Sequence, residues 1–114
     1  MIGTTVEQSK KLVEIGISTD TADMHYSTWT IIDGEWILSP NYNDTIEELQ
    51  EEYGNQIIPA WSLTALLKLI PMPTLSTINY RFCCETSEFS SKYYDEPVDA
   101  AFEMICWLKE NKKI

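Results

Sequence analysis

His25 is the only histidine of the chain, and Asp20 and Asp23 lie within five residues of it. Imidazole and carboxylate groups are ligands that divalent metals accept. Zinc, however, needs at least one more nitrogen or sulfur ligand, and a calcium loop needs oxygen ligands at a denser spacing. A polar loop in front of a strand explains the cluster better. The sequence therefore predicts neither a metal site nor a bound cofactor.

Nucleophilic catalysis would have to use the same histidine as its general base. Ser27 lies two residues further on, but the surrounding sequence has neither a nucleophile elbow nor a third group that would orient the histidine. The carboxylates lie in solvated acidic runs, without the apolar pocket that a pair of catalytic carboxylates requires. We therefore expect no catalytic residues and no enzymatic activity.

The chain has three cysteines, Cys83, Cys84 and Cys106. Three thiols cannot pair completely, and the adjacent Cys83 and Cys84 lack the two-residue gap of redox and zinc motifs. Strand alternation predicts that Cys84 lies in the core and that Cys83 is the more exposed of the two. Free thiols, together with a first segment that lacks the pattern of a signal peptide, favour a cytoplasmic protein.

Charge is distributed unevenly along the chain, which has 18 acidic and 8 basic residues and a formal net charge of −10. No lysine or arginine occurs between Leu12 and Leu67, whereas ten acidic residues occur from Glu14 to Glu52. Phosphate backbones and anionic lipids are repelled by such a surface, so we expect no direct binding to nucleic acids or membranes. The partner that this charge favours is a basic protein.

Length and composition predict a single domain over residues 1–114, because 44% of the residues are hydrophobic and a chain of this size can bury one core. Thr4 and Glu7 have the spacing of a capping box, which predicts the start of a first helix. Gly16 predicts its end, because glycine adopts the backbone conformation that closes a helix.

Asp33-Gly34 has the composition of a two-residue hairpin turn, and alternating apolar residues flank it on both sides. We therefore predict a β-hairpin over residues 26–39. The turn fixes which residues lie opposite each other, and a shift by one residue would turn apolar side chains to the wrong face. The predicted pairs are Trp29 with Leu38 and Ile31 with Trp36.

A short helix is predicted over residues 45–53, with Asn43 or Asp44 as its cap and Tyr53 facing inward. Its outer face carries five carboxylates and no basic residue, which costs stability by mutual repulsion. We predict that this face binds a partner; the alternative is that the acids only keep a small protein in solution. The predicted partner-binding residues of this face are Asp44, Glu47, Glu48, Glu51 and Glu52.

A third helix is predicted from Leu63 to Ile70, after a cap at Ser62. It is apolar on nearly every side, which is typical of a helix buried in the domain or against a partner. Trp61 lies at the entrance to this helix. We predict that the Trp61 side chain is partly exposed and takes part in partner binding, because tryptophan is enriched among the residues that dominate interfaces.

Alternation predicts one strand over residues 76–84 and a second over residues 89–94, joined across Thr86-Ser87. Pro97 predicts the first turn of a C-terminal helix that continues to about Asn111. The order of these elements predicts an α+β fold. It consists of an antiparallel sheet built from two hairpins, with about four helices packed mainly on one face.

Three segments together resemble a known family: Thr21-Ala22-Asp23-Met24, PAWSLTALLKLIP at residues 59–71, and EPVDAAFEMICWL at residues 96–108. They are similar to segments of a family of short uncharacterised proteins that recur in Bacteroides-type gut bacteria, their phages and mobile elements. The resemblance spans most of the chain, with the segments in the same order. It implies no activity and no catalytic residues, but a phage or mobile-element setting favours an accessory or host-interference role.

These observations favour a non-enzymatic protein-binding module, whose acidic half attracts a basic surface and whose apolar residues near Trp61 hold it. One alternative is an acidic inhibitor, a DNA mimic or an antitoxin-like or immunity-like protein, that blocks a nucleic-acid-binding protein. A mimic should space its carboxylates along a surface as phosphates are spaced, whereas a binding module needs only a patch. The other alternative is an enzyme built around His25, which requires His25 to line a deep pocket.

Overall fold

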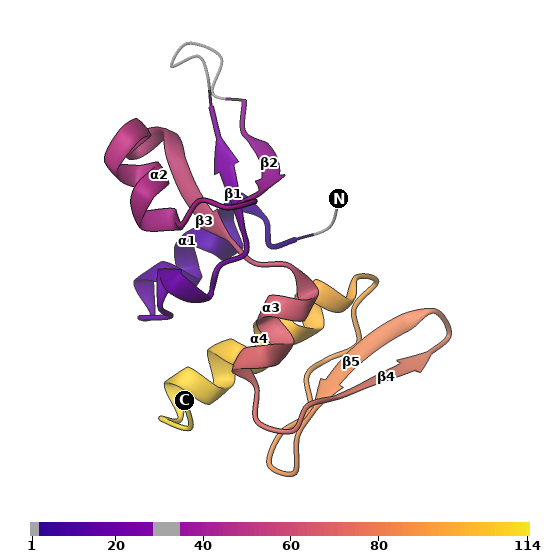
Figure 1. Cartoon of the computed structure of the whole chain (residues 1–114). Helices are drawn as coiled ribbons and strands as arrows, with labels where there is room; N and C mark the ends of the chain where they lie inside the picture. Colours follow the sequence, from indigo (N-terminus) through magenta and orange to yellow (C-terminus); the bar gives the residue numbers. More distant parts are fainter. Residues whose placement is uncertain (1–2, 29–34) are drawn as a thin grey trace. The chain divides into compact units, whose positions relative to one another are not determined.

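The computed structural model describes residues 3–28 and 35–114, and the chain forms two compact units, Met1–Ser62 (unit 1) and Leu63–Ile114 (unit 2). The described residues form four α-helices and five β-strands (Figure 1). The predicted α+β fold is therefore confirmed. The strands belong to two antiparallel sheets, one of three strands and one of two, so the prediction of one sheet is wrong. The single domain, and the packing of the helices on one face, stay predictions.

Helix α1 (Val6–Glu14) opens unit 1 with a capping box. The hydroxyl of Thr5 accepts the N–H of Gln8, and the side chain of Gln8 accepts the N–H of Thr5. The box predicted one residue earlier is wrong because Thr4 is buried, and its hydroxyl accepts the backbone N–H of Trp61 at 3.1 Å. Since a buried hydroxyl needs a partner, this bond holds Thr4 inside and leaves Thr5 to cap the helix.

The sheet of unit 1 has β1 (Met24–Ser27) between β2 (Ile37–Pro40) and β3 (Ile57–Ala60). Strands β1 and β2 pair antiparallel, as the first hairpin predicts, whereas residues 29–34, with the predicted turn and with Trp29 and Ile31, lie outside the described residues. The predicted register is wrong, because Leu38 lies opposite Tyr26 and not opposite Trp29.

The register of β1 is fixed from both sides of the strand. Tyr26 lies opposite Leu38 of β2 and opposite Ile58 of β3, and its hydroxyl donates to the carbonyl of Thr4 at 2.7 Å. Strand β3 is an apolar run in the sequence that we did not predict to be a strand. Its pairing with β1 and the hydrogen bond of Tyr26 hold this register.

Both edge strands of this sheet contain a proline, Pro40 in β2 and Pro59 in β3. The N–H of Asn41 donates to the carbonyl of Asp23, and the alternation of an antiparallel ladder then turns the backbone of Pro40 away from β1. The same alternation turns Pro59 of β3 away from β1. Because proline has no N–H to donate, neither edge is a good template for a further strand.

Helix α2 (Ile46–Tyr53) contacts β3, as α1 also does. Its cap is Thr45, whose hydroxyl accepts the N–H of Glu48 at 3.1 Å, so the cap predicted one or two residues earlier is wrong. Ile46 and Leu49 are buried, which leaves the opposite side of the helix to solvent. That side carries the acidic residues.

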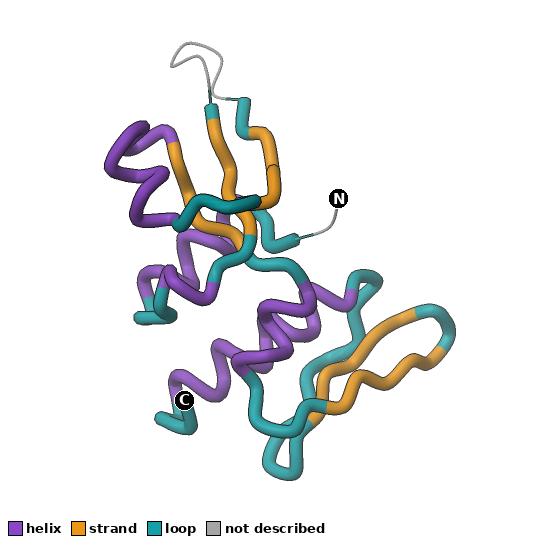
Figure 2. Tube along the Cα trace, in the orientation of Figure 1, coloured by secondary structure: helices purple, strands orange, loops and turns teal. Residues whose placement is uncertain are grey.

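Unit 2 consists of α3 (Leu63–Leu69), β4 (Thr74–Ile78), β5 (Arg81–Glu85) and α4 (Pro97–Glu110), with α4 in contact with both β5 and α3. Figure 2 shows β4 and β5 as a hairpin. Helix α4 begins at Pro97, as predicted. None of the helices in the described parts of the chain is long and apolar enough to span a bilayer.

The strand predicted over residues 76–84 is wrong, because the chain reverses within it. Asn79 and Tyr80 both have positive φ values, 51° and 63°, and join β4 to β5 in a two-residue turn. Such turns favour glycine at their second position, so Asn-Tyr is a weak signal. Residues 89–94, predicted to form a strand with β5, lie beside it and pair through isolated bridges at Ser90 and Tyr94.

Candidate functional site

The acidic face of α2 consists of Asp44, Glu47, Glu48, Glu51 and Glu52, the five carboxylates that the sequence predicts to be there. All five are exposed. The three ion pairs recorded among the described residues involve none of them. Unit 1 has eleven acidic and two basic residues, a formal net charge of −9, and its acidic face is therefore not neutralised locally. The structure thus brings these predicted site residues together on one surface.

A groove of about 290 Å³ lies beside the acidic face, within unit 1. Its floor is formed by alternate residues of the sheet, in which His25 lies opposite Ser39 and Ser27 lies opposite Ile37. Leu49 of α2 forms part of its wall. Helix α2 contacts β3, and the groove is lined by Leu49 and Tyr53 of α2 together with residues of the β1–β2 ladder.

The polar groups of the groove floor are held in fixed orientations. The amide nitrogen of Asn41 donates to the carbonyl of Ala22 at 3.0 Å, which leaves the Oδ1 atom of Asn41 as an acceptor. This oxygen lies 2.8 Å from Nδ1 of His25, so Nδ1 carries the proton and donates. In the neutral ring Nε2 is then the acceptor. The side-chain amide of Asn41 and the Nδ1–H of His25 therefore each donate a hydrogen bond within the fold.

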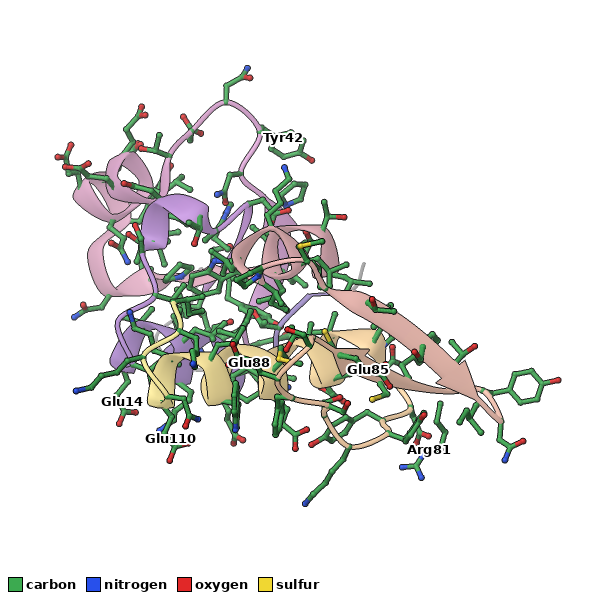
Figure 3. All side chains as sticks on the ribbon, turned by 90° about the horizontal axis from the view of Figure 1, so that it is seen from below. Glu14, Tyr42, Arg81, Glu85, Glu88 and Glu110 are labelled. Carbon is green, nitrogen blue, oxygen red and sulfur yellow. The ribbon has the colours of Figure 1, made fainter. Side chains whose placement is uncertain are left out.

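Two tyrosines and one carboxylate complete the groove. Tyr42 reaches outward from the loop after β2 (Figure 3) and is 86% exposed, whereas Tyr53 is 38% exposed, so the prediction that Tyr53 faces inward is wrong. The carboxylate of Glu52, followed by partial burial, a hydrogen bond to Glu52 and the charge of Asp44, raises the pKa of the Tyr53 phenol. Asp44 belongs both to the groove and to the acidic face, and so joins the two.

Trp61 is fully buried, with none of its surface exposed, so the prediction of a partly exposed side chain is wrong. Its indole Nε1 donates to the hydroxyl of Thr21 at 2.9 Å, and its backbone N–H donates to Thr4. A tryptophan whose polar atom is satisfied internally has no group left for a partner. Trp61 is therefore a core residue of the structure and not part of a binding surface.

The predicted cluster around His25 does not come together. His25 bonds to Asn41, whereas the carboxylate of Asp23 accepts both the backbone N–H and the hydroxyl of Ser62. Within the residues that the structure describes, no group of three or more histidine, cysteine, aspartate or glutamate side chains could hold a metal ion. His25 does line the groove, but its ring bonds to an amide and not to the hydroxyl of Ser27 or Ser39.

All three cysteines are free thiols, and both adjacent ones are buried. Cys84 is in the core as predicted, but Cys83 is only 1% exposed, so its predicted exposure is wrong. The chain after β5 covers it, and its thiol donates to the carbonyl of Ser91 at 3.1 Å. Burial, followed by the charges of Cys83 and Glu85, raises the pKa of the Cys84 thiol from 9.0 to about 11. Such thiols are poor nucleophiles.

The groove itself could not be predicted from the sequence, because its residues come from three strands and a helix that are distant in sequence. Ile57-Ile58-Pro59-Ala60 is the signal that was available. This apolar run between two helices is typical of a buried strand, and a third strand would have placed α2 beside the sheet.

Comparison of the chain with protein-family models, curated proteins and solved structures gave no match. The resemblance to the Bacteroides-type family stays a prediction. A function for this chain is therefore inferred from its own residues.

Proposed function

We propose that unit 1 is a non-enzymatic protein-binding module for a basic partner. The observation that carries this proposal is that the acidic face adjoins a groove with exposed apolar and aromatic side chains. Ile37 and Tyr42, which line the groove, are 49% and 86% exposed. Since Trp61 is in the core, the groove takes the anchoring role that the sequence analysis gave to Trp61.

The two surfaces would contribute differently to binding. Carboxylates on an exposed rim attract a basic protein over distance and mainly raise the association rate. Their reach is about 8 Å at physiological ionic strength. The groove acts only after contact, when its apolar and aromatic side chains lose water, and it therefore governs the dissociation rate.

The alternatives have less support. A DNA mimic needs carboxylates spaced along an extended surface, but α2 has eight residues, or about 12 Å at 1.5 Å per residue, so its acids form a patch. An enzyme built around His25 needs a nucleophile bonded to the ring. The ring bonds to Asn41 instead, and the cysteines lie in unit 2.

Association kinetics test the proposal, with a partner captured by the full chain and measured at several salt concentrations. We expect Glu48→Lys with Glu52→Lys to slow association at least ten-fold and to leave dissociation within about three-fold. The matched control is Glu7→Lys with Glu14→Lys on α1, which changes the net charge of unit 1 equally on exposed positions outside the acidic face. An association rate that ignores salt and both variants would mean that the acidic face is only solvated surface.

A further inference from the structure

We infer that the groove between α2 and the β1–β2 ladder binds the side chain of an arginine presented by the partner. This inference rests on the proposed function, since it names the chemistry of the partner's anchor. Three independent features of the groove lead to it: its charge, its hydrogen-bonding groups and its aromatic walls.

Among the residues that the structure describes, the charge in and beside the groove is negative. Asp44 is the carboxylate among its lining residues, and none of the described lining residues is lysine or arginine. Glu48 and Glu52 line the adjoining hollow together with Asp44. Both Glu52 and Asp44 act on the Tyr53 phenol at the groove wall, so their field extends to that wall. A cation beside Tyr53 would therefore be attracted by at least two carboxylates.

The hydrogen-bonding groups of the groove favour a ligand that donates. The Asn41 amide nitrogen is used by Ala22, and the His25 Nδ1 proton is used by Asn41. Asn41 keeps a second amide N–H, and the hydroxyl and amide side chains of the lining can both donate and accept, whereas the Asp44 carboxylate can only accept. Arginine carries five N–H donors and no acceptor, so it matches this carboxylate better than any neutral side chain does.

The walls of the groove select arginine over lysine. Tyr42 and Tyr53 supply aromatic rings, and Ile37 and Leu49 supply apolar surface. A guanidinium is planar, stacks on aromatic faces and gives up its water more easily than an ammonium group. A volume of about 290 Å³ is at the small end for ligand pockets, which suits one side chain better than a folded segment.

The sheet edges disfavour the main competing mode of peptide recognition. A peptide that added a strand would bind through backbone N–H and carbonyl groups at an outer edge. Pro40 and Pro59 remove an N–H from each outer edge of the sheet of unit 1. Insertion of a side chain into the groove is therefore favoured over strand addition at this surface.

The inference is tested on the full chain by following its backbone amides in ¹H–¹⁵N NMR spectra during titration with short peptides. The peptides are Ac-Gly-Ser-Xaa-Ser-Gly-NH2, with arginine, lysine, the neutral isostere citrulline or norleucine at Xaa. We expect saturable shifts of the His25, Asn41 and Tyr53 amides, with arginine bound at least ten-fold tighter than citrulline and about three-fold tighter than lysine. Octalysine serves as a probe of the acidic face alone.

Two variants and one control decide where the arginine binds. Asp44→Asn and Tyr53→Leu should each weaken the arginine peptide at least five-fold, while Glu7→Gln, the same loss of charge at an exposed position of α1 outside the acidic face, should weaken it less than two-fold. Equal binding of arginine and citrulline, or equal effects of Asp44→Asn and Glu7→Gln, would overturn the inference. If octalysine still binds in that case, the proposed function survives. If octalysine also leaves every amide unshifted at low salt, the proposed function fails as well.

Discussion

Unit 1 carries eleven acidic and two basic side chains, whereas unit 2 carries seven acidic and six basic ones. A solubility device has no reason to be confined to one unit, because charge protects against aggregation wherever it lies on the surface. Within unit 1 the excess is gathered further, onto one side of α2. The difference between the units therefore favours a specific use of the charge.

The two units also differ in what they do with their chemically distinctive side chains. Unit 1 exposes tyrosines and a carboxylate around a groove, with the polar groups of the floor already oriented. Unit 2 buries Cys83 and Cys84, the first with its thiol bonded to the backbone, and leaves only Cys106 half-buried. The tyrosines and the carboxylate around the groove of unit 1 are thus exposed to solvent, whereas two of the three thiols of unit 2 are buried.

The largest expected effect is on the free energy of unfolding, and it distinguishes Trp61 of unit 1 from Trp107 of unit 2. Trp61→Ala removes a fully buried indole with a hydrogen bond to Thr21, which should lower the free energy of unfolding by about 3–5 kcal/mol. Trp107→Ala removes a half-buried ring stacked on Phe89 with a centroid distance of 4.6 Å, and should cost about 1–2 kcal/mol. Urea unfolding followed by circular dichroism measures both.

Trp61→Phe is the control for this pair, because it keeps a buried six-membered ring and loses the pyrrole part of the indole with its N–H. Its cost should lie between those of the other two variants. If Trp61→Ala proved cheaper than Trp107→Ala, Trp61 would not be the centre of a core, and its assignment as a structural residue would be wrong.

Elements with strong local signals could be predicted from the sequence. Helix α4 begins at Pro97, where the sequence places it, because proline at the first turn and the apolar stripe that follows are both local. The carboxylates of α2 are exposed for a similar reason, since burial of Ile46 and Leu49 fixes the other side of the helix. These are the parts of the site that the sequence predicts correctly.

Elements fixed by distant partners could not be predicted in this way. The register of β1 depends on β3, about thirty residues further along the chain, and a strong turn signal at Asp33-Gly34 carries no information about that strand. The burial of Cys83 depends in the same way on Ser91, which the chain brings back over β5. Periodicity assigns faces within one strand, but not what covers each face.

The second expected effect concerns pH and a buried thiol of unit 2. Burial raises the pKa of the Cys84 thiol from 9.0 to about 11, so the folded chain keeps a proton that the unfolded chain releases. Stability should therefore fall as pH rises from about 9 to 11, by roughly 2 kcal/mol. Urea unfolding across this range measures the slope. Cys84→Ala should make this slope smaller but not remove it, because burial also raises the pKa of the Cys83 thiol and of the Tyr94 phenol.

The smallest expected effect is a difference in stability between charge reversals at the two ends of the acidic face. Glu48 in the first turn accepts the hydroxyl of Thr45 at 3.0 Å, and carboxylates there favour the positive end of the helix dipole. Glu47→Lys with Glu48→Lys should therefore destabilise the chain by up to about 1 kcal/mol. Glu51→Lys with Glu52→Lys lies in the last turn, where cations are favoured and where the change also relieves repulsion, so it should stabilise by about 0.5 kcal/mol. Paired thermal unfolding curves measure both signs. If both double variants lowered the stability equally, the repulsion among these acids would be negligible. The acidic face would then not destabilise the fold.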